Sequence, residues 1–452
     1  MEKRLVLFFL TCTILSSCKS GSITNNSTNF LEAFKANQND IIVDNRFIDK
    51  KVNLNYSPFV PKNYKKNIIL AVKNQPTIIS GFENINALIS GEKVAESALK
   101  PQISFQASSG ASRVDSENSF AALGSFSMSK IMYDYGSLEK NVKSQKLRTL
   151  ASKQQLDSQA ESLALSSYLT LFELANNQII QKFYDDGLKL GEPLIEQIKS
   201  ISTSGIADKT MILKARKEFS ELNLLSIKAK NATKNSEVQF KSIFQTNLIP
   251  KLNLIKPIKV ENFEKIKKKM MNYHPSIKAQ NILIQSLKDR LKSLQAQKKP
   301  NLSLRAGINT PAKDPLEDTS ANVGFLVNYV YSDGGKIDAE IESIKAQIKS
   351  SIKQRDEIVR NLNNQLNLSY ERYKGAIEAK KELIELVKIL QETRDTSRAQ
   401  LVSGRSKIQD VLNNELELAK KEIELISIDT NIISASYSLK SLSSGLIPKI
   451  IN

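Results

Sequence analysis

The stretch YVYSDGGKIDAEIESIKAQI, residues 329–348, changes from one structural period to another within a few positions. Its beginning continues an alternation typical of a strand, and its end places isoleucines three and four residues apart, as a helix does. Asp333-Gly334-Gly335 separates the two patterns, and glycine permits the sharp backbone turn that such a change requires. The stretch therefore predicts a strand that runs directly into a long helix.

An earlier stretch, IMYDYGSLEKNVKSQK at 131–146, makes the same change at Asp134-Tyr135-Gly136. We predict two strand-to-helix junctions, marked by Asp134 with Gly136 and by Asp333 with Gly335. A junction that occurs twice points to a duplication.

Matching residues recur in order along the chain. Five pairs lie 199 residues apart, and NLIPKL (247–252) matches GLIPKI (445–450) at a separation of 198; the pairs are Pro76 and Pro275, Pro101 and Pro300, Asp134 and Asp333, Gly136 and Gly335, and Gly205 and Gly404. We infer two repeats of one plan. The predicted divisions are a signal peptide at 1–17, a lipid-anchored linker at 18–61, a first repeat at 62–251, a linker at 252–260, a second repeat at 261–449 and a tail at 450–452.

Each repeat begins with helical periodicity, at 63–98 and 261–297, interrupted by a proline that should start or kink a helix. Two alternating runs follow, separated by the polar loops SRVDSENS and TPAKDPLEDTS. In the second repeat one face carries Val323, Phe325, Val327, Tyr329 and Tyr331, and the other carries small or polar residues. The sequence predicts four strands in the chain.

The residues after each junction are helical over a long distance. From Gly335 to Gly404 there are 69 residues, which as one helix would measure ~100 Å. Gly205 and Gly404 are predicted to mark the tips where each helix reverses. Predicted coiled-coil seams run through Ile337, Ile341, Ile344, Ile348 and Ile352, and on the return helix through Leu412, Leu416, Ala419, Ile423, Ile426, Thr430 and Ile433.

The amino terminus predicts export. Lys3 and Arg4 precede an apolar run, Leu5 to Leu15, that is too short to span a bilayer. The sequence Leu-Ser-Ser-Cys that ends at Cys18 resembles a bacterial lipobox, in which the cysteine carries lipid such as palmitate. An ordinary secretory signal is the alternative.

Composition excludes several classes of function. The chain has 65 Lys and Arg against 47 Asp and Glu, a net charge of +18, but the lysines are spread among glutamates, which disfavours nucleic-acid binding. A single histidine, His274 before Pro275, no tryptophan and two cysteines give no constellation for catalysis. We predict no enzyme activity, no cofactor and no metal site.

Four strands cannot close a membrane barrel, and open sheet edges are not tolerated in lipid. Three chains would supply twelve strands. The predicted fold class is an α+β membrane protein, a trimeric twelve-stranded β-barrel continued by a long α-helical coiled-coil barrel, with internal duplication.

The sequence from about 60 to 449 resembles the TolC family of outer-membrane efflux proteins. The duplicated plan and the two tips, TSGIADKTMILKAR and VSGRSKIQDVLNNELEL, carry the resemblance. It implies a homotrimer in outer-membrane lipid, with tips at Gly205 and Gly404 docked by a periplasmic adaptor and, through it, by an inner-membrane RND or ABC transporter. It also implies a constriction at Asp410. Asn413 stands where a second acid can occur, and Met211 is equivalent to Asp410 in the first repeat.

The expected function is the outer-membrane channel of a tripartite efflux or type I secretion system, anchored by lipid and extending into the periplasm. The alternative is a lipid-anchored coiled-coil scaffold that does not conduct. The sequence does not specify the transported substrate, because the pump selects it.

Anchoring is predicted to depend on Cys18. Because no other cysteine follows a lipobox, a Cys18→Ala variant should incorporate no labelled fatty acid, whereas a Cys12→Ala variant should be labelled normally. Persistent labelling of Cys18→Ala would remove the lipoprotein assignment.

Overall fold

The structure is a computed structural model that describes residues 64–114, 117–203, 209–311, 319–402 and 405–450. All of them belong to one compact unit, Ser57–Asn452. Cys18, Gly205 and Gly404 lie outside the described residues.

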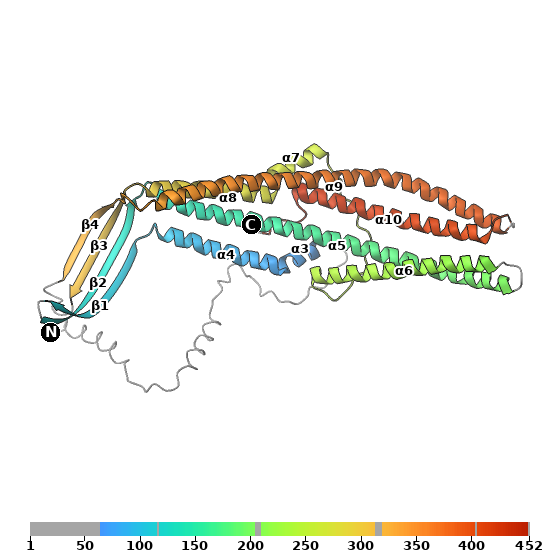
Figure 1. The fold of residues 1–452 in the computed structure, drawn as a ribbon, viewed down its shortest axis with the longest axis horizontal. Coiled ribbons are helices and arrows are strands. Elements are labelled where there is room, and N and C mark those ends of the chain that lie inside the picture. Colours follow the sequence, from blue (N-terminus) through green and yellow to red (C-terminus); the bar gives the residue numbers. More distant parts are fainter. Residues whose placement is uncertain (1–63, 115–116, 204–208, 312–318, 403–404, 451–452) are drawn as a thin grey trace, which may run out of the picture. The chain divides into compact units, whose positions relative to one another are not determined.

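One order of elements, helix-helix-strand-strand-helix-helix, occurs twice along this unit (Figure 1). In five of the six pairs the first residues lie 199 positions apart, for example 336 minus 137. The first copy consists of α3 (Tyr64–Asn74), α4 (Pro76–Ser97), β1 (Gln102–Val114), β2 (Glu117–Tyr133), α5 (Ser137–Thr203) and α6 (Lys209–Phe244). The second consists of α7 (Phe263–Tyr273), α8 (Pro275–Gln297), β3 (Asn301–Pro311), β4 (Ser320–Asn328), α9 (Lys336–Val402) and α10 (Ile408–Ser444).

The four strands form one antiparallel sheet in the order β1-β2-β3-β4. β4 ends at Asn328, which pairs with Asn301, the first residue of β3. The sequence pattern predicted a strand through Tyr331, but the preceding Pro300 has no N–H to donate, and β3 offers no partner beyond that point. Residues 329–332 are therefore outside the sheet of the single chain.

The first hairpin is longer than the sequence predicted. The polar stretch SRVDSENS was expected to be a loop, yet Val114 pairs with Glu117, so most of that stretch is strand. Backbone pairing supplies the ladder bonds whichever side chains the residues carry. In the second hairpin, residues 312–318 of the expected loop lie outside the described residues.

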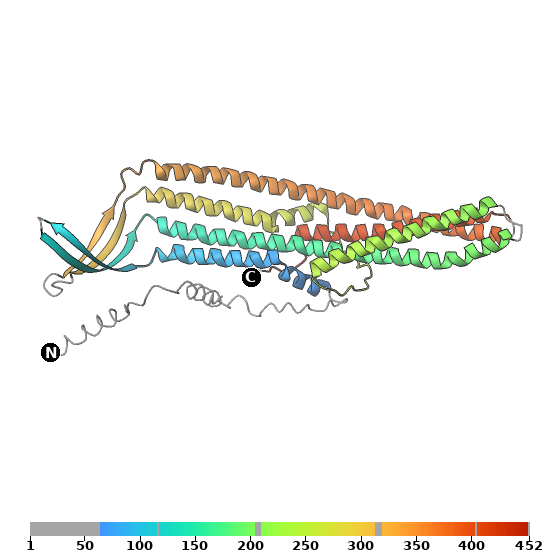
Figure 2. The same cartoon turned by 60° about the horizontal axis from the view of Figure 1, so that its bottom comes forward.

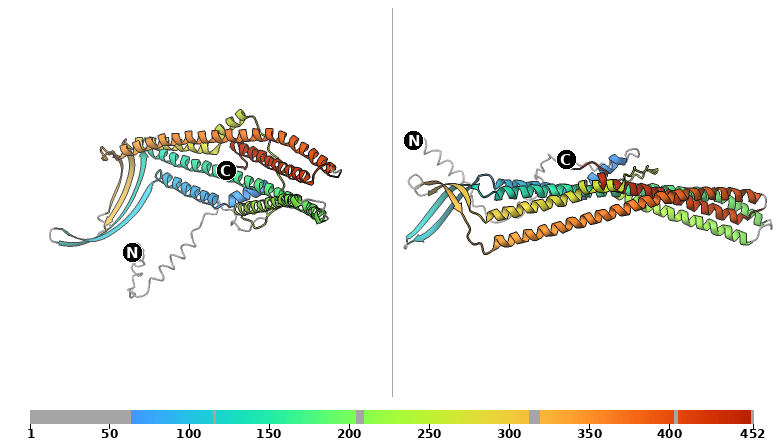
Figure 3. Two further views of the ribbon diagram at one scale, coloured as in Figure 1. Left: turned by 45° about the vertical axis from the view of Figure 1, so that its right-hand side comes forward. Right: turned by 90° about the horizontal axis from the view of Figure 1, so that it is seen from above.

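The helices α4, α5, α8 and α9 lie side by side and continue the four strands in the same order (Figures 2 and 3). The contact between α5 and α8 is the most extensive between two elements, and it joins the two repeats. Small side chains allow the two backbones to approach. Ser144 Oγ donates to the Ser286 carbonyl at 2.9 Å, and Ser286 Oγ donates to the Ser144 carbonyl at 2.8 Å.

Towards the tips, α5 pairs with α6 and α9 pairs with α10. The buried seam between α9 and α10 contains Val387, Leu390 and Leu418, and Val411 is buried one heptad before Leu418. The predicted seam is wrong at its tip end, where Leu412 and Leu416 are only half-buried, whereas its last member, Ile433, is buried as predicted. Val411 and Leu412 are adjacent and both apolar, and the helical period alone does not determine which of the two is buried.

The main hydrophobic core surrounds the middle of α5. Residues from α3, α4, α6 and α10 pack on it, and the largest buried members are Ile68, Val72, Ile78, Leu171, Phe172, Leu174 and Phe240. The chain segments that follow α6 and α10 return to this region. Gln178 holds the first return segment, because its side chain donates to the Pro250 carbonyl at 3.0 Å and accepts from the Leu252 N–H at 2.9 Å.

The two strand-to-helix junctions have the same hydrogen bonds. Asp134 accepts from the N–H groups of Gly136 at 3.0 Å and Leu138 at 2.7 Å. Asp333 accepts from those of Gly335 and Ile337, both at 2.9 Å. Each carboxylate caps the first turn of a 67-residue helix.

Residues with positive φ make the turn at each junction. They are Tyr135 (57°) and Gly136 (76°) at the first, and Gly334 (67°) and Gly335 (84°) at the second. The backbone hydrogen bonds hold the pKa of Asp333 below its usual range, so this carboxylate stays ionised at neutral pH.

The caps lead to a prediction about stability. Asp134→Ala should destabilise the protein by about 1 kcal/mol, whereas Asp134→Asn, which keeps an acceptor, should cost less. Because the folded pKa of Asp333 is lowered, its contribution should be lost as pH falls through that pKa. Thermal unfolding against pH measures both effects. Glu139→Gln, which removes a charge from the same helical turn but no cap, is the control, and an equal loss there would contradict the capping role.

Candidate functional site

The sheet has two chemically different faces. Cross-strand partners form rows through all four strands, and successive rows point to opposite sides. The apolar rows are Ile103-Met128-Ala306-Val323 and Phe105-Phe126-Ile308-Ala321. The polar rows are Gln102-Ser129-Arg305-Gly324, Ser104-Ser127-Gly307-Asn322 and Gln106-Ser125-Asn309-Ser320.

The apolar face is uncovered. Phe105 is 74% exposed, Val323 76% and Phe325 71%, so the largest side chains of the sheet lie outside the hydrophobic core. A continuous exposed apolar surface marks contact with a partner or a membrane. Alternation of an apolar face with a polar face is the pattern of a wall with lipid on one side and water on the other.

Aromatic side chains continue the apolar face towards the helices. Tyr133 pairs with Leu302 on this face, and Tyr329 lies two residues beyond Val327, the partner of Leu302. Both tyrosines are more than half exposed. Tyrosines at the border of an apolar band are typical of the membrane-water interface.

Both outer strands of the sheet, β1 and β4, have a second edge without a partner among the described residues. Their outward N–H and C=O groups would remain unsatisfied in lipid. In lipid, the sheet would therefore need further strands at both edges.

At the tip end, the structure describes Asp410 and Asn413 but neither glycine. Asp410 is the third residue of α10, and its exposed carboxylate accepts from the Lys407 N–H at 3.4 Å. Asn413 is also exposed, three residues further along the helix. The two side chains therefore lie on neighbouring positions of one helix surface, away from buried Val411.

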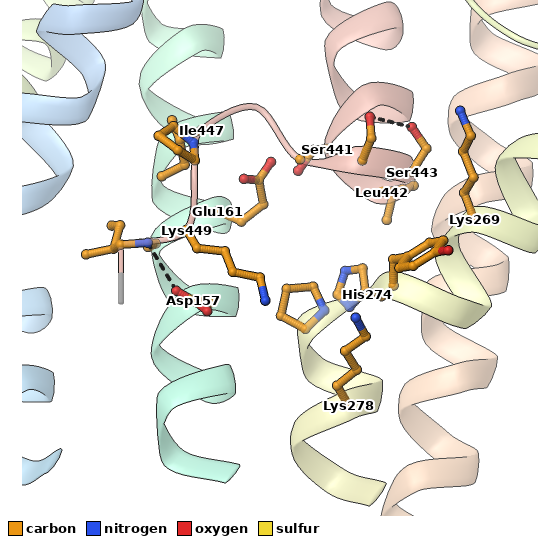
Figure 4. Close-up of a pocket in the computed structure, with 17 residues that line it drawn as sticks. Asp157, Glu161, Lys269, His274, Lys278, Ser441, Leu442, Ser443, Ile447 and Lys449 are labelled. Carbon is orange, nitrogen blue, oxygen red and sulfur yellow. Dashed lines mark hydrogen bonds between the residues drawn. The ribbon is translucent and has the colours of Figure 1, made fainter. Parts of the chain in front are cut away.

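A second region with charged residues lies beside α5, under the segment that follows α10 (Figure 4). It encloses a pocket of about 360 Å³. Glu161 accepts from the Leu446 N–H at 2.7 Å, and Asp157 accepts from the Ile450 N–H at 3.3 Å. Burial raises the pKa of Glu161. These carboxylates hold the backbone of the return segment, as Gln178 does in the first repeat.

His274 also lines this pocket and has a structural role. Its Nδ1 accepts from the Ser276 N–H at 3.3 Å and caps α8. Burial lowers the pKa of His274 to about 4, so the imidazole is neutral at neutral pH. Asp157, Glu161 and His274, three of the polar residues that line the pocket, are thus engaged in holding the chain together.

The residues that hold the return segments were missed by the sequence reasoning. Their one signal is that Glu161 lies among the apolar positions of α5, between buried Ala160 and Ala164. The described residues contain no group of three or more His, Cys, Asp and Glu side chains placed to hold a metal ion. None of the described helices is both long and apolar enough to cross a membrane.

Comparison with known proteins agrees with this geometry. Residues 268–445 match the family described as outer membrane efflux protein. No curated protein sequence matches the chain.

Solved structures of outer-membrane channels share the fold along most of both chains. The CusC channel has a TM-score of 0.77 at 13% identity and covers 86% of this chain and 93% of its own. VceC of Vibrio cholerae has a TM-score of 0.76 at 12% identity and covers 86% of this chain and 97% of its own. The open state of MtrE of Neisseria gonorrhoeae has a TM-score of 0.72 at 12% identity and covers 85% of this chain and 90% of its own.

The α+β fold with four antiparallel strands and two 67-residue helices is that of these channels. The family consists of channels and not enzymes. The chain is therefore similar to the outer membrane efflux proteins over residues 268–445, and over most of its length it has the fold of the CusC, VceC and MtrE structures.

Proposed function

We propose that three copies of this chain form the outer-membrane conduit of a tripartite efflux or type I secretion system. Three four-stranded sheets would close a barrel of twelve strands, and the helices α4, α5, α8 and α9 of each chain would continue it as a helical barrel in the periplasm. A lipid on Cys18 would add an anchor in the same membrane.

The two-faced sheet with two open edges carries this proposal. An apolar face towards lipid and a polar face towards water require closure, because an open edge in the bilayer leaves backbone groups unsatisfied. The alternative, a scaffold that does not conduct, gives no reason for a sheet whose large apolar side chains are exposed on one side only.

The duplication supplies the register of closure. β2 and β4 are equivalent strands, and so are β1 and β3. Within the chain Met128 of β2 pairs with Ala306 of β3. Adding 199 to the first number and subtracting 199 from the second gives Val327 opposite Ala107 of the next chain. The same register would pair Tyr329 with Phe105 of the next chain, which extends β4 over residues that have no partner within one chain.

This register is testable with cysteine pairs. Ala107→Cys combined with Val327→Cys should form disulfides between chains, because directly opposite residues lie within disulfide reach. Met128→Cys with Ala306→Cys, the equivalent pair inside the chain, is the positive control. Ala107→Cys with Val323→Cys is displaced by four residues, about 13 Å, and should not link.

Non-reducing electrophoresis of outer membranes separates these outcomes. Chains that never crosslink, although the internal pair does, would contradict closure in this register. Efficient linking of the displaced pair would contradict it equally.

We place the docking of a periplasmic adaptor, and through it of an inner-membrane RND or ABC transporter, at the tips marked by Gly205 and Gly404. The two long helices reach this end of the chain, furthest from the sheet (Figure 1). A photo-crosslinking residue at either position should capture the adaptor, and capture only from sites near the sheet would exclude the tips.

Asp410 is proposed to line the constriction near the tips, with Asn413 beside it. Three carboxylates around one axis would attract cations and resist anions. Asp410→Ala should therefore raise the conductance of single channels in planar bilayers or lower their preference for cations. Asp410→Asn retains a cap acceptor and separates the charge from the cap on α10. Unchanged conductance and selectivity in both variants would leave Asp410 with the capping role alone.

A further inference from the structure

The polar face of the sheet carries one charge. Among strand residues whose side chains the structure describes, Arg305 is the single ionisable residue on this face. The other members are serine, glutamine, asparagine and glycine, with a few aliphatic residues. Glu117 shares the face by register, but it lies twelve residues along β2 from Ser129, the partner of Arg305, or about 40 Å away.

The surroundings of Arg305 leave its guanidinium available. Its cross-strand partners are Ser129 and Gly324, and Gly307 follows two residues later on the same face. None of these side chains reaches as far from the sheet as arginine does. The Arg305 side chain is exposed, and its guanidinium forms no hydrogen bond or ion pair with any residue that the structure describes. An unpaired guanidinium requires water, which identifies this face as the wetted one.

The opposite face offers a matched comparison. Lys130 is the one charged residue among the described side chains of the apolar face, where it pairs with Leu304. It lies three residues before the end of β2, so its flexible stem can carry the ammonium to the membrane border. Arg305 and Lys130 thus place a positive charge on opposite faces of the sheet.

We propose that Arg305 is a selectivity residue of the β-barrel, which favours the passage of anions and of solutes with carboxylate, phosphate or sulfate groups. The inference rests on the proposed trimeric barrel with its polar face inward. Three guanidinium groups, on a stretch of wall with no other charge among the described side chains, would raise the local concentration of anions within about one Debye length, about 10 Å at 0.1 M salt. Asp410 would act in the opposite sense near the tips, so the two charged positions sort ions at different levels of the conduit.

The test measures reversal potentials of single channels in planar bilayers under a KCl gradient. With salt near 0.1 M, Arg305→Gln should lower the ratio of chloride to potassium permeability by roughly two-fold, because the wall loses its charge. Arg305→Lys retains the charge and should retain most of the ratio. At about 1 M salt, where the Debye length is about 3 Å, parent and Arg305→Gln should become indistinguishable.

Lys130→Gln is the control, since it removes one positive charge from the lipid side and should leave the ratio unchanged. An Arg305→Gln ratio equal to the parent's at low salt, or an equal change in Lys130→Gln, would overturn the assignment to Arg305. Should Arg305→Gln fail to assemble, the parent and Arg305→Lys still decide, because a parental ratio that does not respond to salt contradicts a charged wall.

The proposed conduit and the selectivity residue fail in different ways. A parent that forms no channels removes the trimeric conduit and the selectivity residue with it. A parent that conducts, with a ratio insensitive to residue 305, removes the selectivity residue alone.

Discussion

The fold depends on joining a sheet to a layer of helices that is wider than the sheet. Neighbouring strands lie about 4.8 Å apart, whereas packed helices lie about 8–10 Å apart, yet four strands continue into four helices in the same order. Inclining the strands to the helices, as Figure 1 shows, widens the sheet along its border. Serines between α5 and α8 let these two helices pack closely, which reduces the width of the helical layer. At the two junctions, turns with positive φ redirect the chain from each strand to its helix, and they accommodate the remaining difference in width between the sheet and the helical layer.

The helix α5 supports both repeats. It packs on α8 of the second repeat, and its polar side chains hold both return segments, Gln178 the first and Glu161 the second. Each of these bonds satisfies a backbone N–H in a segment that has no secondary structure of its own. The two halves of the chain are therefore similar in plan but unequal in what they support.

Features set by neighbouring residues could be predicted from the sequence. An aspartate before glycine and a helical pattern defined both junctions, and Pro76 and Pro275 each begin the second helix of a pair, because both signals act within one turn of chain. Features that depend on residues far away in the sequence could not be predicted from it. The end of β4 is set by Pro300, just before the neighbouring strand β3, and the α9–α10 seam by a choice between the adjacent apolar residues Val411 and Leu412. Of the candidate site, the face alternation could be read from β4, whereas the one signal for Glu161, an acid among apolar helix positions, does not tell which backbone group it binds.

In a threefold assembly, a chain with two repeats would place six similar repeats around the axis. A given residue occurs once in each chain, so it would occupy three of these six positions. The counterpart of Arg305 is Gln106, and the counterpart of Asp410 is Met211, so both charges belong to the second repeat alone. In such an assembly like charges would stand 120° apart instead of 60°, with an uncharged position between each pair. In a trimeric channel, duplication would thus let charged and neutral positions alternate around one circumference, a spacing that six copies of a single repeat would be unable to produce.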